Sequence, residues 1–517
     1  MAFIKSNEFY DLKIIKKSVL TILTVFLAMK FTGGAGFVVV IPFMLMALFQ
    51  NRNEPLLFWI VLTNLLADTN DFFAPKGGIF SASYRLLLLG VGLYGALLFF
   101  SLRTSKFVIP LLGIFAYLIY MILPSLQGWA PMIATFKLIF FSSTYMALAY
   151  VSSKAQADGR LDMRRLRSIM LAFAIVYVGG SLLVYPFPGI SQMNASFAQS
   201  GAGTSLYRGM VNHSQTMGVL ICCFMIFLLG DLFFNLQRKD KLYTCLLLCG
   251  LFLIGKTSSR TAMGSLLATV GFLAYNMMQT KGMNSRWKSK VMSTLTTVMV
   301  LAAAVVLLIP SVRNRVARTA MKWDREATSE SFTLEQAVSS RMGLVDYSLY
   351  LWKLKPTIGW GFQVDPASGE LEKKSGGFVF SAPIEKGVWV TAILEEGGTF
   401  GLIIYCLYAI VAFITLMMNR AYMGSTVFLA IHISNLGEFT MFSMSSVGCV
   451  WYTVLFTALV FDAKRMRGAM GGPMCGPGFG PPPGGAFGLG PRIGRRLSAG
   501  GNSSAGRQDP QFEIRKA

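Results

Sequence analysis

Long apolar runs recur along the chain and are separated by short polar segments. About 20 apolar residues in a helix are enough to cross the roughly 30 Å hydrocarbon core of a bilayer. The pattern predicts fourteen spans, at 17–31, 34–50, 54–67, 84–102, 106–123, 132–151, 168–186, 212–235, 242–255, 260–279, 291–310, 389–418, 422–436 and 443–461. Three of these are short, near the length of re-entrant or tilted pieces, so we expect 12–14 transmembrane helices.

The composition supports this interpretation. Of the 517 residues, 54% are hydrophobic and 14% are charged, whereas soluble domains contain about 25% charged residues. A soluble protein of this length would expose too much apolar surface, which excludes a soluble enzyme, a disulfide-rich secreted domain and a disordered chain. We therefore expect an all-α, polytopic membrane protein.

The net charge of +23 suggests an orientation in the membrane. Lys and Arg collect in short loops on the cytoplasmic side of membrane proteins. If all fourteen spans cross, one side holds the N-terminus, 103–106, 152–167, 236–241, 280–290 and the C-terminal tail, and each of these is basic. Both termini are then cytoplasmic. No zinc finger, RNA-binding signature or basic stripe interleaved with aromatic residues is present, so we expect no nucleic acid partner.

Four regions follow from this pattern. They are an N-terminal transmembrane bundle (1–310), a large external or periplasmic loop (311–388), C-terminal transmembrane helices (389–462) and a tail (463–517). Inside the loop, apolar residues from Leu334 to Trp352 recur at helical spacing and predict an amphipathic helix, which Lys355-Pro356 ends. The tail is rich in Gly, Pro and Arg, so we expect it to be disordered and to contact anionic lipids.

One stretch matches the Walker A pattern letter for letter, Gly250-Leu-Phe-Leu-Ile-Gly255-Lys256-Thr257. A phosphate-binding loop of this type needs a preceding strand and an exposed loop. Here the variable positions are Leu, Phe, Leu and Ile inside an apolar run, so we interpret the match as coincidence. The cysteines lie mostly in apolar runs without neighbouring His or carboxylate residues, and we expect no metal or cofactor.

Polar groups gather at the outward-facing edges of two spans. Arg208, Asn212 and His213 lie where one apolar run begins, and Arg260 lies at the edge of a later one. An arginine there can simply extend to the interface, and a histidine at a helix start is often a satisfied interfacial residue. Polar groups at membrane depth are nevertheless costly, which makes these residues candidates for a functional site.

These residues belong to two of four short motifs that occur in order over about 200–401. Arg-Gly-x-x-x-His-x-Gln-x-x-Gly at 208–218 resembles the opening of a span in the O-antigen ligase and O-antigen/exopolysaccharide polymerase superfamily. Ser-Ser-Arg-Thr-Ala at 258–262 resembles a second segment of that family. Arg341 with Trp352 and Pro356-Thr-Ile-Gly-Trp-Gly-Phe362 resembles its large loop, and Leu-Glu-Glu-Gly-Gly-Thr-Phe-Gly at 394–401 resembles the entry to its next span.

The resemblance implies a metal-independent glycosyltransferase. It would transfer a glycan from a polyprenyl-pyrophosphate lipid to an acceptor hydroxyl at the outer face of the bacterial inner membrane. Arginines can neutralise the pyrophosphate leaving group, and we assign Arg208, Arg260 and Arg341 to that clamp. The family's usual loop histidine is absent, because Gly387 lies about nine residues before Glu396. Glu385 and His213 are therefore the candidate bases, and Lys386 a candidate phosphate contact.

The sequence thus predicts a polymerase of lipid-linked glycan repeats, and the missing histidine favours this over an O-antigen ligase. Its expected partners are a polyprenyl-pyrophosphate-linked oligosaccharide, a glycan acceptor and polysaccharide export or chain-length proteins. A secondary transporter for an organic anion would also explain basic residues along a pathway. It predicts repeated halves and broken helices, however, and the sequence pattern indicates neither. A non-catalytic polysaccharide assembly factor is a third hypothesis.

Overall fold

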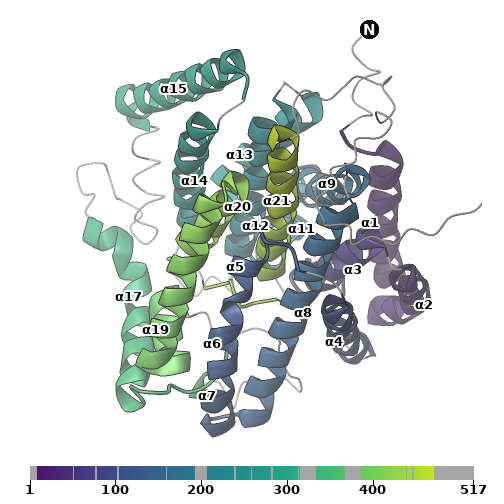
Figure 1. The fold of residues 1–517 in the computed structure, drawn as a ribbon, viewed down its shortest axis with the longest axis vertical. Helices are drawn as coiled ribbons and strands as arrows, with labels where there is room; N and C mark the ends of the chain where they lie inside the picture. The colour runs from purple at the N-terminus through teal and green to yellow at the C-terminus, as the bar shows by residue number, and fades with distance from the viewer. Residues whose placement is uncertain are drawn as a thin grey trace, which may run out of the picture. The chain divides into compact units, whose positions relative to one another are not determined.

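The computed structural model describes a helical bundle (Figure 1). It describes residues 9–50, 52–75, 79–101, 104–158, 160–192, 207–237, 240–257, 259–280, 283–311, 314, 334–366, 386–437, 439–444 and 447–470. The chain divides into two units, Met1–Met470 and Gly471–Ala517, and the second lies outside the described residues. The described elements are all helices, without a β-strand among them, so the predicted all-α class is confirmed.

Each of the fourteen predicted apolar runs contains helix. Several runs are divided by a turn or a π-helical segment rather than forming one continuous helix. The elements are α1 (Leu12–Thr32), η2 (Gly33–Ala35), α2 (Gly36–Phe49), α3 (Asn53–Leu65), α4 (Ile79–Phe100), α5 (Ile109–Leu112), α6 (Ile114–Tyr120), α7 (Ile122–Gln127), α8 (Pro131–Asp158), α9 (Arg160–Ala174), η3 (Ile175–Gly179), α10 (Gly180–Val184), α11 (Pro188–Ser191), α12 (Ser214–Asp231), η5 (Leu232–Leu236), α13 (Lys241–Thr257), α14 (Arg260–Gln279), α15 (Ser285–Leu308), α17 (Leu334–Leu354), α19 (Trp389–Met418), α20 (Tyr422–Ser434) and α21 (Val447–Met470).

Seven helical segments are long and apolar enough to cross a bilayer. An eighth is possible if Leu12–Val38 and Val40–Met46, which meet at a 64° bend inside α2, count as one broken span. The chain is therefore a multi-pass membrane protein, with fewer full-length spans in the described part than the 12–14 expected. The difference lies partly in short helices, because α3 and α20 have 13 residues each and reach only about 20 Å.

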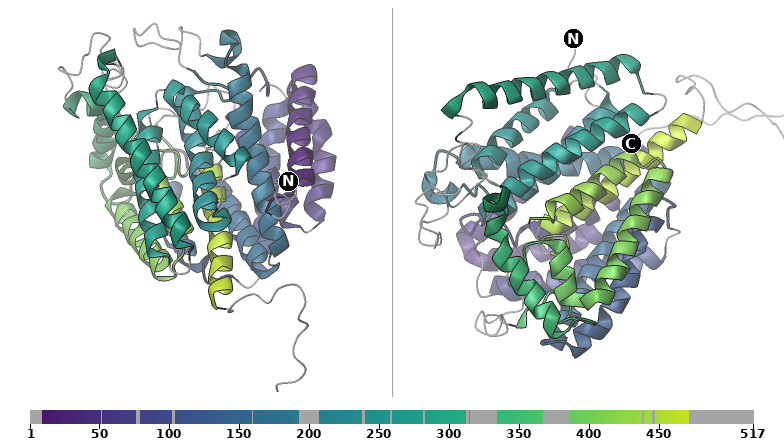
Figure 2. Two further views of the ribbon diagram at one scale, coloured as in Figure 1. Left: turned by 90° about the horizontal axis from the view of Figure 1, so that it is seen from above. Right: turned by 90° about the vertical axis from the view of Figure 1, so that its left-hand side faces the viewer.

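The core is built around α12 and α21. In their most apolar windows 89% and 94% of the residues are buried, whereas only 28% are buried in α19. Figure 1 shows α12 and α21 in the middle of the bundle, and the left view of Figure 2 shows the N-terminal helices and α19 on opposite sides of it. The exposed side of α19 is lined with Ile403, Leu407, Ile410 and other large apolar residues, as expected where a helix faces lipid.

One end of the bundle is fixed by buried charges. Arg167 of α9 makes a bidentate pair with Asp231 of α12, at 2.7 and 2.8 Å, and both side chains are buried. Tyr243 and Asn235 also donate hydrogen bonds to Asp231. These contacts join α9, α12 and α13 at the end where short basic turns connect the helices. We call this end the basic end.

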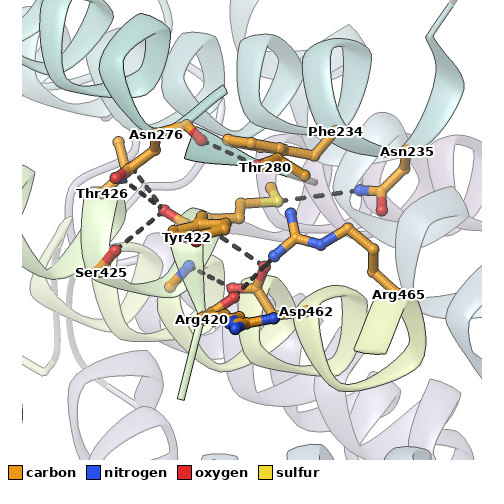
Figure 3. A network of polar contacts seen from close by, with 12 residues as sticks. Phe234, Asn235, Asn276, Thr280, Arg420, Tyr422, Ser425, Thr426, Asp462 and Arg465 are labelled. Carbon is orange, nitrogen blue, oxygen red and sulfur yellow. Dashed lines mark hydrogen bonds and ion pairs between the residues drawn. The ribbon is translucent and has the colours of Figure 1, made fainter. Parts of the chain in front are cut away.

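A second network at the basic end begins at Asp462 of α21 (Figure 3). Its carboxylate accepts the backbone N–H groups of Met423 and Gly424, so it caps the first turn of α20. Arg465 pairs with Asp462 at 3.0 Å and donates to the carbonyl of Arg420. Helix α21 continues to Met470, past residue 463, where we expected the tail to begin.

Candidate functional site

Helix α19 is interrupted near its start. Gly398 has φ +65° and ψ −167°, which breaks the helical ladder inside Trp389–Met418. The carbonyl groups freed by the break find partners from outside the helix. Trp360 N–H donates to Glu395 O at 3.0 Å, Gly361 N–H donates to Glu396 O at 2.9 Å, and the Tyr120 hydroxyl donates to Gly397 O at 2.7 Å. The break is therefore filled by protein groups.

The segment that fills the break is 355–366, which follows α17. Gly359 has φ +68°, and a Cβ atom there would lie 2.5 Å from the carbonyl oxygen of Glu396. A Cβ atom at Gly398 would overlap the carbonyl of Thr357. Glycine is needed at both positions because two backbones touch. Two of the four motifs, the loop motif and the Glu-Glu-Gly-Gly motif, thus form one joint.

A buried lysine lies beside this joint. The Lys386 ammonium is 2.8 Å from Glu395 Oε1 and 2.9 Å from Glu396 Oε1, and it donates to the carbonyl of Val364 at 2.9 Å. Ser348 of α17 donates a further hydrogen bond to Glu395, at 2.8 Å. Lys386, Glu395 and Glu396 are each no more than 3% exposed. We call these three residues the lysine cluster.

The electrostatics of the lysine cluster keep its cation charged. Burial alone would lower the pKa of Lys386, but the two carboxylates outweigh burial and raise the pKa above its ordinary value. Nearby, the Tyr347 hydroxyl donates to Asp365 at 3.0 Å, and burial together with the Asp365 carboxylate raises the pKa of Tyr347 to about 12. The cluster ties α17, the 355–366 segment and α19 together.

A second buried lysine supports the same segment from α8. Lys137 is fully buried and donates to the carbonyl of Gln363 at 2.9 Å. Gln363 itself has φ +53°, a left-handed conformation that is uncommon for a residue other than glycine. The chain therefore turns sharply at Gln363 where Lys137 holds it.

The other two motifs also meet. Gly218 of α12 packs against the turn between α13 and α14, where a Cβ atom at Gly218 would lie 2.5 Å from Ser259 Cβ. Ser259 caps α14 by accepting the N–H of Ala262 at 3.4 Å. His213 caps α12, because its Nδ1 accepts the N–H of Gln215 at 3.2 Å. The helix carrying His213 thus crosses close to the start of the helix carrying Arg260.

Backbone contacts fix the segment that precedes α12. The Arg208 N–H donates to Ser191 O at 2.8 Å, and its Nε donates to Ile190 O at 3.2 Å. Further along, Asn70 N–H donates to Met210 O at 2.8 Å, and Asn212 N–H donates to Asp68 O at 2.7 Å. Arg208 is half-buried at this edge of the bundle.

The two motif pairs are joined through 435–437. Gly437 lies so close to Thr261 that a Cβ atom would overlap its hydroxyl. Two residues earlier, the Asn435 carbonyl accepts the N–H of Trp389 at 3.0 Å, just before the broken part of α19. All four motif segments therefore lie at the end of the bundle opposite the basic end. We call this the motif end.

The structure describes some of the predicted site residues fully and others only in part or not at all. Arg208, Arg260 and His213 are described at the motif end, with His213 exposed and Arg260 half-buried at the start of α14. Arg341 lies in α17, but its side chain is outside the described part, and so is the whole of Glu385. Lys386 has different partners from the phosphate we expected, because its ammonium contacts two carboxylates and a carbonyl.

Sequence reasoning overlooked Lys137 and the ion pairs of Glu395 and Glu396. A signal was available for Lys137, because it lies inside the apolar run 132–151, where an ionisable residue is unusual. The partners of Lys386 could not be read from spacing, since Val364 and the two glutamates lie on opposite sides of it in the chain. Their contact depends on how the loop folds back.

The Walker-like stretch is helical. Helix α13 runs from Lys241 to Thr257, which leaves no room for a phosphate-binding loop between Gly250 and Lys256. The Lys256 ammonium lies 5.4 Å from the ring centres of both Tyr185 and Phe252. The side chain therefore extends along aromatic surface, as lysines at membrane edges do.

Among the residues that the structure describes, no group of three His, Cys, Asp or Glu side chains is arranged to hold a metal ion. A scan against protein-family models finds no match to the chain. A search of curated proteins finds no match either. What the chain does must therefore be argued from its own residues.

Proposed function

We propose that this protein transfers or polymerises lipid-linked glycan repeats at the motif end of its bundle. The observation that carries the proposal is the convergence of four motif segments, 208–218, 258–262, 356–362 and 394–401, at one end of the bundle. The first and the last of these segments are about 175 residues apart in sequence. Direct contacts join them in pairs, at Gly218 with Ser259 and at Gly359 with Glu396.

The chemistry suits a pyrophosphate leaving group. Arg208 and Arg260 place two guanidinium-bearing residues at the motif end, and Arg341 lies in the helix that packs on α19. A guanidinium donates two parallel hydrogen bonds to a phosphate and stays charged at any relevant pH. Charge that develops on the departing pyrophosphate would be stabilised by these donors.

The capping contact of His213 determines which of its ring nitrogens can donate a hydrogen bond to the substrate. Because Nδ1 accepts the N–H of Gln215, the neutral ring carries its proton on Nε2. Nε2 is then a donor, which suits a contact to phosphate better than the removal of a proton. We assign His213 to the phosphate and keep Glu385 as the residue that would accept the proton of the acceptor hydroxyl.

We further propose that the motif end faces the outside of a bacterial inner membrane and that both termini are cytoplasmic. The basic turns 236–241 and 280–290 lie at the opposite end, as the distribution of Lys and Arg in membrane proteins requires. The lipid-linked substrate would then be bound from the outer leaflet.

The test is the lipid-linked oligosaccharide profile of a strain that lacks the protein. Accumulation of single repeats on the lipid is expected for a polymerase, and long chains that are not attached to their acceptor would indicate a ligase. A profile identical to that of the parent strain, with intact surface polysaccharide, would contradict both activities.

A secondary transporter gains support from two broken helices. Its broken-helix prediction is met by α19 at Gly398 and by the 64° bend inside α2, between Val38 and Val40. In transporters, however, the carbonyl groups freed by such a break bind the transported ion. Here three of them accept hydrogen bonds from Trp360, Gly361 and Tyr120, so we rank this function second.

A further inference from the structure

A groove runs along the side of the bundle between α19 and α20. Its volume is about 370 Å³, and its walls come from these two helices alone. Cys406, Ala409 and Phe413 line it from α19, and Phe428 and Leu429 line it from α20. Ile410 and Ile414 on its rim are 58% and 50% exposed, so the groove opens sideways, on the apolar face of a bilayer-spanning helix.

His432 lies at the end of the groove nearer the motif end, and both of its ring nitrogens are already engaged. Nδ1 must donate to the carbonyl of Phe428, at 2.8 Å, because a carbonyl can only accept. Nε2 is then the acceptor for the Tyr405 hydroxyl at 3.1 Å. His432 therefore offers no hydrogen bond to a ligand. The surface of the groove is almost entirely apolar, so it suits a chain without polar groups.

The length of the groove matches one leaflet. Residues 406 and 414 are eight positions apart on α19, which corresponds to roughly 12 Å along a helix axis. Half of a hydrocarbon core is about 15 Å thick. The groove therefore accommodates hydrocarbon on one side of the membrane's midplane.

The position of the groove relates it to the motif end. The end of the groove nearer the motif end is formed by Trp389 and His432. Trp389 N–H donates to Asn435 O, and Gly437 packs on Thr261, the residue after Arg260. A lipid whose phosphate lay at the motif end would find the mouth of the groove where its hydrocarbon chain begins.

We propose that this groove binds the first part of the isoprenoid chain of the polyprenyl-linked substrate. The proposal rests on the proposed function for the identity of the lipid. The groove holds the chain by apolar burial, and the motif end holds the phosphate. Specificity for a polyprenyl lipid over ordinary phospholipids then comes from both contacts together.

The experiment uses the full-length protein in nanodiscs and two photoreactive probes. One is a polyprenyl phosphate with a diazirine in its isoprenoid chain, and the other is a phosphatidylethanolamine with a diazirine in an acyl chain. We expect the polyprenyl probe to label peptide 406–414, and unlabelled polyprenyl phosphate to compete with it. The phospholipid probe should label the same peptide weakly and without competition.

Matched variants on α19 complete the test. Ala409→Trp fills the groove and should reduce labelling about tenfold, which corresponds to the loss of roughly two buried methylene contacts. Ala409→Ile is a milder filling variant in case the tryptophan impairs folding. Leu407→Trp adds the same bulk at a position that is 59% exposed and does not line the groove, and it should leave labelling unchanged.

Equal labelling by the two probes, or labelling that Ala409→Trp and Ala409→Ile do not reduce, would overturn the proposal. Competed labelling of 406–414 in a protein that shows no glycan transfer would support the groove while contradicting the proposed function. Glycan transfer that persists when the filled groove no longer binds polyprenyl phosphate would leave the function intact and remove the groove from it.

Discussion

At the scale of single residues, Lys386 joins the buried charges of the motif end. Its ammonium is the shared partner of two buried carboxylates and of the Val364 carbonyl. Removing one member of a buried ion pair leaves an uncompensated charge and is far more destabilising than replacing the whole group by neutral residues. In the lysine cluster, removal of the lysine alone should therefore be much more destabilising than neutralising all three residues.

We expect Lys386→Met to destabilise the protein by about 3–5 kcal/mol. The triple variant Lys386→Met, Glu395→Gln, Glu396→Gln removes all three charges and should recover most of that loss. Thermal unfolding of the detergent-purified protein measures both. Lys353→Met, at an exposed position of α17, is the control and should change little. A triple variant as unstable as Lys386→Met would show that the charges are not the cause.

The pH dependence of this contribution follows from the raised pKa of Lys386. A lysine whose folded-state pKa is raised contributes its full stabilisation below the unfolded value of about 10.4, and loses it as the pH rises through the folded value. The difference in melting temperature between the wild-type protein and the triple variant, which lacks all three charges, should therefore stay constant from pH 7 to about pH 10. A difference that disappears by pH 9 would mean that burial dominates and that Lys386 is neutral there.

Glycan assembly should depend on the planar shape of the arginine side chains at the motif end and not only on their charge. Arg208→Lys, Arg260→Lys and Arg341→Lys keep the positive charge and lose the two-pronged donor. Each should reduce glycan assembly by roughly ten- to a hundredfold, the effect of losing about 1.5–3 kcal/mol at the transition state. Polymer length and yield in complemented cells are the measurement, at matched protein levels. Arg286→Lys, exposed on α15, serves as the control. Normal polymer from all three variants would contradict the assignment of these arginines to the pyrophosphate.

At the scale of elements, the joint between the 355–366 segment and the break in α19 brings two backbones into direct contact. Both glycines of the joint have positive φ, and a side chain at either would meet backbone atoms. The break cannot be closed into a regular helix without expelling the segment. Hydrogen bonds from Trp360 and Gly361 hold the two together.

Gly398→Ala should therefore destabilise the protein. The conformation alone costs about 1–3 kcal/mol for a residue other than glycine, and the overlap with Thr357 adds to this. Gly343→Ala is the matched control, because Gly343 lies in α17 with open space around it. That change should stabilise the helix by about 0.5–1 kcal/mol. Thermal unfolding compares the two, and similar effects of both substitutions would contradict the joint.

Sequence patterns predicted the helices well because a long apolar run leaves the backbone few alternatives in a membrane. They did not predict the break at Gly398 or the partners of Lys386, because both depend on a segment that returns from about thirty residues away. The Glu-Glu-Gly-Gly motif contains Gly398, but we singled it out for its resemblance to a family and not because it predicted a break. The sequence shows Lys137 as a charge inside an apolar run. It does not indicate that the partner of Lys137 is the carbonyl of Gln363.

At the scale of the whole molecule, the two ends of the bundle differ in kind. The basic end holds structural ion pairs, with Arg167 on Asp231 and Arg465 on Asp462. The motif end holds arginines, an exposed histidine and a loop segment fixed by buried lysines. Between them the apolar groove follows α19 into the membrane. This division suits an enzyme that binds a lipid from one leaflet and reacts at its head group.

The most direct test is a reconstitution of the purified protein in liposomes with a polyprenyl-pyrophosphate-linked oligosaccharide as the sole substrate. Our account predicts longer lipid-linked chains, or chains passed to an added acceptor, together with release of polyprenyl pyrophosphate without an added metal or nucleotide. Arg208→Lys and Arg260→Lys should slow both. Failure of the active, correctly folded protein to release polyprenyl pyrophosphate in the presence of donor and acceptor would contradict the central claim.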